Sequence, residues 1–377
     1  MSGLLPHVDP DGLLEYSVVY TDRSLNHMSQ RFQQVMRDIS AGLKGLYRAE
    51  SVVVVPGGGT FGMEAVARQF ATDQHCLVLR NGWFSYRWSQ IFETGRIPAS
   101  ERVLKARPVE PGPRAALAPA PIEEVVASIR EHRPALVFAA HVETAAGMML
   151  PDPYLKAVAD AVHEVGGLFV LDCIASGTLW VDMKASGVDI LLSAPQKGWS
   201  SSPCCGLVML SERARRRIED TQSSSFACDL KKWLQIMEAY EQGGHAYHAT
   251  MPTDALLRFR DTIRETEALG FALLKQRQQQ LGSRIRALLA ARGIKSVAAD
   301  GFAAPGVVVC YTDDAAIKSG GKFAVEGLQI AAGVPLQCDE PADFQTFRIG
   351  LFGLDKLQNV DRTVATFEQA LDKVLRG

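Results

Sequence analysis

The segment from Gly167 to Lys197 constrains the fold of this chain more than any other part of the sequence. A first apolar run, Leu168–Leu171, ends at Asp172, and a second, Val188–Leu192, is followed closely by Lys197. Short apolar runs bounded by turn residues are typical of buried strands, so both runs are predicted to be neighbouring strands of one sheet. The acid and the lysine are then expected at the carboxyl edge of that sheet, where open α/β sheets bind ligands.

The combination of Asp172 with Lys197 suits one cofactor in particular. Pyridoxal 5′-phosphate forms a Schiff base with a lysine and needs an acid beside its ring nitrogen. We therefore interpret these two residues as catalytic. The ordinary alternatives are an aspartate that caps the next helix and a lysine that is solvated at the surface.

Composition and charge exclude several other classes of protein. With 377 residues the chain is long enough for two domains, and its net charge of -2 gives no reason to expect nucleic acid or an anionic membrane as partner. No apolar run approaches the roughly 20 residues that span a bilayer. The seven cysteines show neither a disulfide framework nor the spacing of a metal site. The N-terminus has no signal-peptide pattern, so a cytoplasmic enzyme is expected.

Strand-like and helix-like segments alternate along the first two thirds of the chain. Strands are predicted at 52–55, 76–79, 135–138 and 206–210, besides the two named above, and helices at 27–47, 61–70, 122–132 and 153–165, with another beginning near residue 84. This alternation predicts an α/β fold with a mainly parallel sheet between layers of helices.

Three parts of the chain are expected to differ in organisation. Residues 1–22 are turn-rich and then extended, which predicts an N-terminal arm. Residues 23–258 are predicted to form the large domain, and 259–377 a smaller α+β domain. A long helix over 254–292, interrupted at Gly270 and Gly282, is expected to connect them, followed by strands near 307–311 and 346–351 and a closing helix at 357–375.

A glycine loop, Pro56-Gly57-Gly58-Gly59-Thr60-Phe61-Gly62, lies between a predicted strand and a predicted helix. Backbone amides at such a helix N-terminus can bind a phosphate, and the Thr60 hydroxyl adds a donor. The G-x-G-x-x-G spacing also fits a dinucleotide site, although the acid expected about 20 residues later is missing; Arg80 would then bind the 2′-phosphate of NADP. A third possibility is a tight turn without a ligand.

Seven separated motifs resemble, in the right order, those of class V aminotransferases, and most of all the alanine–glyoxylate and serine–pyruvate aminotransferase group. The resemblance runs from about His27 to the C-terminus. The motifs are PGGGTFGMEA, NGWFSYR, HVETAAG, LDCIAS, SAPQK, AYHAT and FRIGLFG. It implies fold type I of the pyridoxal-phosphate enzymes, with a seven-stranded, mainly parallel sheet in the large domain.

The resemblance also implies roles for individual residues. Gly58, Gly59 and Thr60 correspond to the phosphate cradle, with Gln196 beside the phosphate. Phe84 corresponds to the aromatic residue stacked on the pyridine ring, with Trp83 as the weaker candidate, and Thr144 to the residue that contacts the ring hydroxyl. Arg348 corresponds to the clamp for the substrate carboxylate. Tyr247 and Thr250 correspond to residues that bind the phosphate in the partner subunit, which implies a homodimer with shared active sites.

The expected activity is transamination between a small amino acid, such as alanine or serine, and a small 2-oxo acid, such as glyoxylate or pyruvate. Lys197 would move the proton in a ping-pong cycle through pyridoxamine phosphate. One alternative is a pyridoxal-phosphate-dependent lyase such as a cysteine desulfurase, with Cys338 as nucleophile; a more remote one is an NADP-dependent oxidoreductase. Residues 9–29 depart from the glycine–proline-rich stretch that lines the family's substrate pocket, so substrate identity is not implied.

Overall fold

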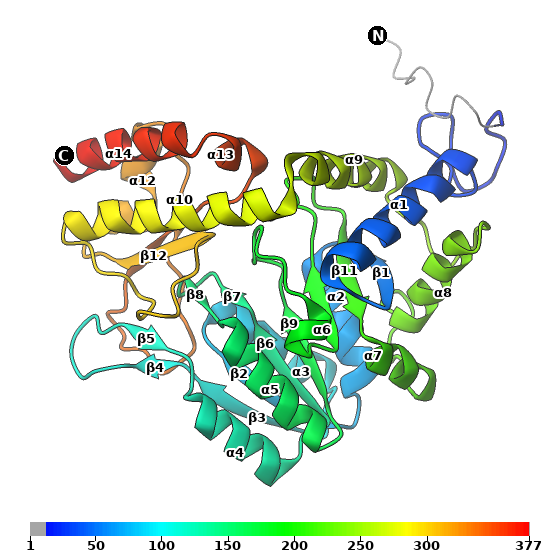
Figure 1. Ribbon diagram of the computed structural model, residues 1–377, viewed down its shortest axis with the longest axis horizontal. Coiled ribbons are helices and arrows are strands. Elements are labelled where there is room, and N and C mark those ends of the chain that lie inside the picture. The colour runs from blue at the N-terminus through cyan, green and yellow to red at the C-terminus, as the bar shows by residue number, and fades with distance from the viewer. Residues whose placement is uncertain (1–12, 377) are drawn as a thin grey trace.

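A computed structural model describes residues 13–376 of the chain (Figure 1). The turn predicted at residues 9–12 and most of the predicted N-terminal arm therefore lie outside the described residues. The helix and strand bounds below show an α/β architecture, as the alternation of segments predicts.

A seven-stranded sheet forms the centre of the large domain. Its strands lie in the order β1 (Ser51–Pro56), β11 (Cys205–Leu210), β10 (Ile190–Ser193), β9 (Leu168–Asp172), β6 (Leu136–Ala140), β2 (His75–Arg80) and β3 (Ser100–Lys105). Within residues 13–376, β11 is the one strand of this sheet that runs in the direction opposite to the other six. β9 and β10 are parallel neighbours, with Leu192 opposite Asp172, which confirms the prediction for the segment 167–197.

Helices cover both faces of this sheet, and the direction of each crossover decides which face. α2 (Gly59–Val66) and α3 (Trp83–Gly95) each connect a strand to one that lies nearer the β3 edge of the sheet. α4 (Ile122–His132), α5 (Asp152–Glu164) and α6 (Met183–Ser186) each connect a strand to one that lies farther from that edge. Because parallel crossovers are right-handed, the two sets must lie on opposite faces, and Figure 1 shows α4 and α5 in front of the sheet.

A group of helices packs beside β1 and completes the large core. α1 (Gln30–Tyr47) begins after Ser29, whose side chain accepts a hydrogen bond from the Phe32 amide, as the predicted cap requires. Its apolar residues recur at helical spacing and are buried against α8 (Leu230–Glu241) and α9 (Thr253–Leu269). α7 (Glu212–Arg217) follows β11.

The C-terminal part of the chain forms a second core. A three-stranded antiparallel sheet, β12 (Val307–Tyr311), β14 (Thr346–Gly350) and β13 (Ala331–Ala332), packs against α10 (Phe271–Ala291). α13 (Leu354–Gln358) and α14 (Val360–Arg376) lie along α10, and two short helices, α11 (Ala315–Lys318) and α12 (Gly321–Val325), complete this part (Figure 1).

The long helix predicted over 254–292 is two helices, and the break falls at Gly270 alone. Gly270 has φ +91°, a backbone conformation that favours glycine and ends α9. Gly282 lies inside α10 without interrupting it. A Cβ there would lie 2.5 Å from the backbone of Pro305, so this glycine allows close packing rather than a turn.

Two further differences concern element bounds. The helix predicted at 61–70 begins at Gly59 and ends in a π-helical turn, Ala67–Ala71. Phe259 and Ile263 of α9 pack in the large core, although the predicted domain boundary precedes them; the division into 1–22, 23–258 and 259–377 stays a prediction. Among the described residues, no helix is long and apolar enough to cross a membrane.

Candidate active site

Asp172 lies at the carboxyl end of β9, in the middle of the sheet. Its side chain is 7% exposed and accepts a hydrogen bond from the Ile174 amide at 2.9 Å. Burial raises its pKa to about 7, and the nearby carboxylate of Glu143 adds to this effect; Arg87 and Lys197 oppose it. A buried acid beside two cations is a candidate functional residue, and a positive group next to it would favour its carboxylate form.

Lys197 follows β10 and is brought to the same edge of the sheet. Its Nζ lies 5.5 Å from the centre of the Phe352 ring. Burial lowers its pKa, and the positive charge of Arg348 lowers it further, while Asp172 raises it. A lysine with a depressed pKa has more of the neutral amine that a nucleophile or a base requires.

The glycine loop folds as a strand-to-helix turn at the same edge. Gly57 has φ +121°, which favours glycine, and Gly58 precedes the first turn of α2. A Cβ at Gly59 would lie 2.5 Å from Ile174 Cδ1, so the loop lies against the segment that follows Asp172. A Cβ at Gly58 would meet nothing within 4 Å, so the space above this backbone is open.

Phe84 lies between two arginines at the start of α3. The Arg87 guanidinium carbon lies 5.3 Å from its ring centre, and that of Arg348, on β14, lies 5.6 Å away. Arg348 Nε donates to the Ala332 carbonyl at 2.7 Å. The structure therefore places the predicted stacking residue next to the predicted carboxylate clamp, although they are 264 positions apart in the sequence.

Glu143 is a residue of the site that the sequence did not single out. It is fully buried and accepts hydrogen bonds from the amides of Phe84, Ser85 and Ala145 and from the Ser85 hydroxyl, at 2.8–3.2 Å. It thereby fixes the N-terminus of α3, and with it Phe84. Burial raises its pKa, while these hydrogen bonds lower it. Its neighbour Thr144, predicted to contact the ring hydroxyl, is buried in the same loop.

These residues fit a bound pyridoxal phosphate. The open backbone at Gly58 leaves room at a helix N-terminus, which suits a phosphate. Gln196, next to Lys197, has a buried Oε1 without a hydrogen-bond partner among the described residues, so its amide side chain is free to turn toward a ligand. The Asp172 carboxylate and the Lys197 amine supply the two groups that the cofactor needs.

Tyr247 and Thr250 contact each other, and Tyr247 also contacts His27 of the same chain. The Tyr247 hydroxyl pairs with Thr250 Oγ1 at 3.2 Å, and its ring lies 5.5 Å from that of His27. The Tyr247 side chain is 55% exposed. Their predicted role in a neighbouring subunit's site stays a prediction.

Arg80 and Cys338, the residues on which the two alternative functions depend, are both buried and have other contacts. Arg80, the candidate for an NADP 2′-phosphate, is buried and donates to Ser89 Oγ and the Gln337 carbonyl. Cys338, the candidate desulfurase nucleophile, is 7% exposed, and burial raises the pKa of its thiol to about 12. A thiol in this state is a poor nucleophile near neutral pH.

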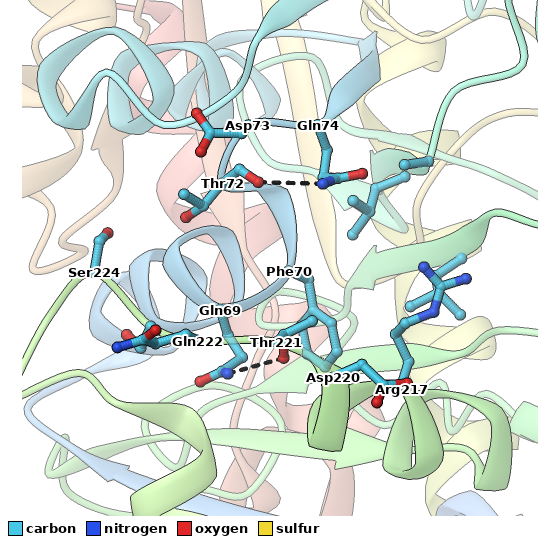
Figure 2. Close-up of a pocket in the computed structure, with 14 residues that line it drawn as sticks. Gln69, Phe70, Thr72, Asp73, Gln74, Arg217, Asp220, Thr221, Gln222 and Ser224 are labelled. Atoms are coloured by element: carbon cyan, nitrogen blue, oxygen red, sulfur yellow. Dashed lines mark hydrogen bonds between the residues drawn. The ribbon is translucent and has the colours of Figure 1, made fainter.

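A cavity of about 690 Å³ lies at the opposite edge of the sheet (Figure 2). Leu136 and Leu168, the first residues of β6 and β9, line it, and it extends to the segment 217–224. The Gln69 amide points across it to Thr221 and is hydrogen-bonded at both ends, to Thr221 Oγ1 and by the Lys231 amide. Because ligands of α/β folds bind at the carboxyl edge, this cavity is not the candidate site.

No cluster of histidine, cysteine or acidic side chains suited to a metal ion is found over residues 13–376. His141, in the loop after β6, pairs through Nδ1 with Ser176 Oγ at 2.8 Å. Burial, together with the charge of Lys275, lowers its pKa to about 4, so it is neutral at pH 7. These contacts agree with a structural role.

The chain is similar to known aminotransferases in sequence and in fold. The chain is 24% identical over 360 residues to an alanine–glyoxylate aminotransferase of Rattus norvegicus, covering 93% of this chain and 82% of the relative. It is 29% identical over 358 residues to a 2-aminoethylphosphonate–pyruvate transaminase of Burkholderia ambifaria, covering 91% and 88%. The crystal structure of an alanine–glyoxylate aminotransferase from Nostoc sp. superposes with a TM-score of 0.78 at 22% identity, covering 93% and 88%.

The family assignment rests on a match that spans most of the chain. The family model for class-V aminotransferases matches residues 12–342, which include every predicted site residue except Arg348. The likeness in fold to the solved structure above covers 93% of the chain. The chain therefore belongs to the class-V aminotransferases, and its cofactor is pyridoxal 5′-phosphate.

Proposed function

We propose that this enzyme transfers the amino group of a small amino acid, of the alanine or serine type, to a small 2-oxo acid such as glyoxylate or pyruvate. The proposal is carried by the closeness of Lys197, Asp172 and Arg348. The charge of Lys197 lowers the pKa of Asp172, and the charges of Asp172 and Arg348 change the pKa of Lys197. The names of the relatives, which include alanine, glyoxylate and pyruvate, support this substrate class.

Lys197 is the proton carrier in this proposal. Its amine is partly buried, and burial and the Arg348 charge lower its pKa, while Asp172 raises it. The lowered pKa favours the neutral amine, which can accept a proton from the substrate Cα and return it later. Proton transfer by a positioned side chain contributes roughly 10²–10⁴-fold to rate. The Phe352 ring beside Nζ restricts where the amine can lie.

Asp172 holds a proton on the ring nitrogen of the cofactor. When bound, pyridoxal phosphate supplies an acceptor for the electrons left at the substrate Cα. Gly58, Gly59, Thr60 and Gln196 are the proposed phosphate ligands, Thr144 is the proposed partner of the ring hydroxyl, and Phe84 is the proposed stacking residue. A positive nitrogen beside Asp172 favours the carboxylate form, which offsets the burial that raises its pKa in the free chain.

Arg348 is the proposed clamp for the substrate carboxylate. Among the described residues no carboxylate lies within ion-pair distance of it, and its Nε is already bonded to Ala332. The remaining guanidinium nitrogens can donate two parallel hydrogen bonds to a carboxylate. Burial lowers its pKa, and Glu143 raises it, but an arginine stays charged in either case.

Replacing Arg348 with glutamine should lower kcat/KM for amino acids roughly a hundredfold, the value of a lost charge-assisted contact. Most of the loss should appear in KM, because the clamp acts in binding. Arg348→Lys should recover little, since lysine lacks the planar fork. Steady-state kinetics with L-alanine test this, and affinity for pyridoxal phosphate is the control. Unchanged kinetics in Arg348→Gln would show that the carboxylate binds elsewhere.

We infer that two chains share their active sites. Tyr247 is 55% exposed, and Phe61 and Phe226 are also exposed aromatic side chains at 52% and 77%. Aromatic side chains are enriched at protein interfaces relative to the rest of the surface. The Tyr247–Thr250 pair carries hydroxyl groups that suit the phosphate of a neighbouring chain.

A mixture of two inactive variants tests this sharing. Lys197→Ala and Tyr247→Ala should each have low activity as homodimers. A mixed dimer has one site with an intact lysine that also receives an intact Tyr247, so co-refolded or co-expressed chains should regain up to about a quarter of wild-type activity by random pairing. A mixture that gains nothing, from chains that sedimentation shows to be dimeric, contradicts the shared site.

The predicted cytoplasmic location stays a proposal. The seven cysteines are free and buried, which suits a reducing compartment. Cell fractionation with antibody detection tests it, and recovery of the protein outside the cytoplasm would contradict it.

A panel of amino donors tests the substrate proposal. L-alanine, L-serine, L-aspartate and 2-aminoethylphosphonate should each be assayed against glyoxylate and pyruvate. The proposal expects the highest kcat/KM for alanine or serine. A preference of tenfold or more for aspartate or the phosphonate would replace this substrate class, while leaving the transaminase chemistry in place.

A further inference from the structure

Arg87 connects the glycine loop to the stacking residue. It lies one turn after Phe84 on α3, and its Nη1 donates to Thr60 Oγ1 at 3.1 Å. Its guanidinium carbon lies 5.3 Å from the Phe84 ring centre. The side chain is half-buried, and its charge acts on Asp172, where it lowers the pKa. Arg87 thus contacts both Thr60 of the glycine loop and the Phe84 ring, and its charge also influences Asp172.

The charges around Phe84 leave Arg87 without an anion. Over residues 13–376, no carboxylate lies within ion-pair distance of Arg87, and the same holds for Arg348 and Lys197. Glu143 is occupied by the amides at the start of α3, and Asp172 serves the ring nitrogen. These three cations leave a local excess of positive charge, which favours the binding of anionic groups. One of these groups is the substrate carboxylate at Arg348.

The position of Thr60 identifies the second anion. Thr60 lies in the first turn of α2, two residues after the open backbone at Gly58, where the helix N-terminus favours a phosphate. Because Arg87 Nη1 lies 3.1 Å from Thr60 Oγ1, the guanidinium lies beside this helix N-terminus. We propose that Arg87 binds the phosphate of pyridoxal phosphate and supplies the cationic side of the cradle; this rests on the proposed placement of the phosphate at Gly58–Thr60.

Arginine suits this position better than lysine would. Its planar fork can donate to a phosphate oxygen and to Thr60 Oγ1 at the same time, and its face can remain over Phe84. The same side chain would then anchor the phosphate and orient the stacking ring. This role could not be predicted from residue spacing, because the Thr60–Arg87 contact depends on how α2 and α3 pack.

Equilibrium binding to the apoenzyme tests the proposal. Apoenzyme from wild type, Arg87→Gln, Arg87→Lys and Arg102→Gln is titrated with pyridoxal phosphate and, separately, with pyridoxal, which has the same aldehyde and ring but no phosphate. Quenching of tryptophan fluorescence reports both affinities. Arg102 is an exposed arginine on β3 and serves as the matched control for loss of one positive charge. Circular dichroism and melting temperature show that each variant is folded.

Arg87→Gln should weaken pyridoxal phosphate binding about tenfold to a hundredfold, the range for a lost charge-assisted hydrogen bond, and leave pyridoxal binding unchanged. Arg87→Lys should lie between, and Arg102→Gln should match wild type. Inorganic phosphate should compete with pyridoxal phosphate on wild type and at least tenfold less effectively on Arg87→Gln.

Two results overturn the proposal. Equal weakening of pyridoxal phosphate and pyridoxal would show that Arg87 only positions Phe84, and unchanged affinities for both would show no role in binding. A third result would show that the phosphate does not bind at Gly58–Thr60 at all. In that case the wild-type protein itself would bind pyridoxal phosphate no more tightly than pyridoxal.

Discussion

Lys197→Ala should lower the rate of transamination by about ten-thousandfold or more, the upper range for loss of a positioned proton carrier. The variant should still fold, because the lysine is partly exposed and makes no ion pair among the described residues. Steady-state assays with L-alanine and glyoxylate measure the loss. Lys184→Ala, an exposed lysine on α6, is the control and should match wild type.

Two further measurements separate a chemical role of Lys197 from a structural one. Added methylamine should restore part of the activity of Lys197→Ala, because a free amine can take over the proton transfer. Borohydride treatment of the wild-type holoenzyme should attach the cofactor to the peptide that contains Lys197. Retention of more than a hundredth of wild-type activity, or labelling of another lysine, would contradict the assignment.

Asp172→Asn should inactivate the enzyme and, above neutral pH, stabilise its cofactor-free form. Burial, with a smaller contribution from Glu143, raises the pKa of Asp172 from 3.8 to about 7. The folded chain therefore binds a proton between about pH 4 and pH 7 that the unfolded chain does not, so the free energy of unfolding falls as pH rises through this window. At pH 8 the charged carboxylate costs on the order of 4 kcal/mol, which asparagine removes.

Urea unfolding of the apoenzyme at pH 4 and pH 8 checks the sign. Asp172→Asn should be more stable than wild type at pH 8, and the difference should shrink toward zero at pH 4. Asp300→Asn, at an exposed position, should follow wild type. The activity of Asp172→Asn should fall at least roughly a hundredfold, as for other lost electrostatic contacts of a transition state. A variant less stable than wild type at pH 8 would show that the carboxylate is favourably paired in the free chain.

The central strands were predictable because their residues form short apolar runs. The run 188–192 and the strand β10 overlap over most of their length, and α4 has the predicted bounds. β3 was missed, since Ser100–Lys105 is an edge strand that carries charged and exposed residues, so it lacks an apolar run. α8 was also missed, within a segment whose apolar residues are interleaved with charged ones.

The principal site residues were predictable for a different reason. Asp172 and Lys197 follow neighbouring parallel strands, and the resemblance to the family added Phe84 and Arg348. Glu143 and Arg87 were not found, because their roles depend on contacts with α3 and the glycine loop that sequence spacing does not reveal. Tyr247 cannot be assigned within one chain, since its proposed partner is the phosphate of a neighbouring subunit.

The half-reaction of the holoenzyme with one amino donor tests the central claim most directly. Wild-type enzyme mixed with L-alanine, without any oxo acid, should lose the visible absorbance of bound pyridoxal phosphate and release one pyruvate per site. Adding glyoxylate should restore the absorbance and yield one glycine per site. Unchanged absorbance with no pyruvate released from L-alanine would contradict transamination. With L-serine as the only substrate, continuous release of pyruvate and ammonia would instead show a β-elimination with loss of water, which is a lyase reaction.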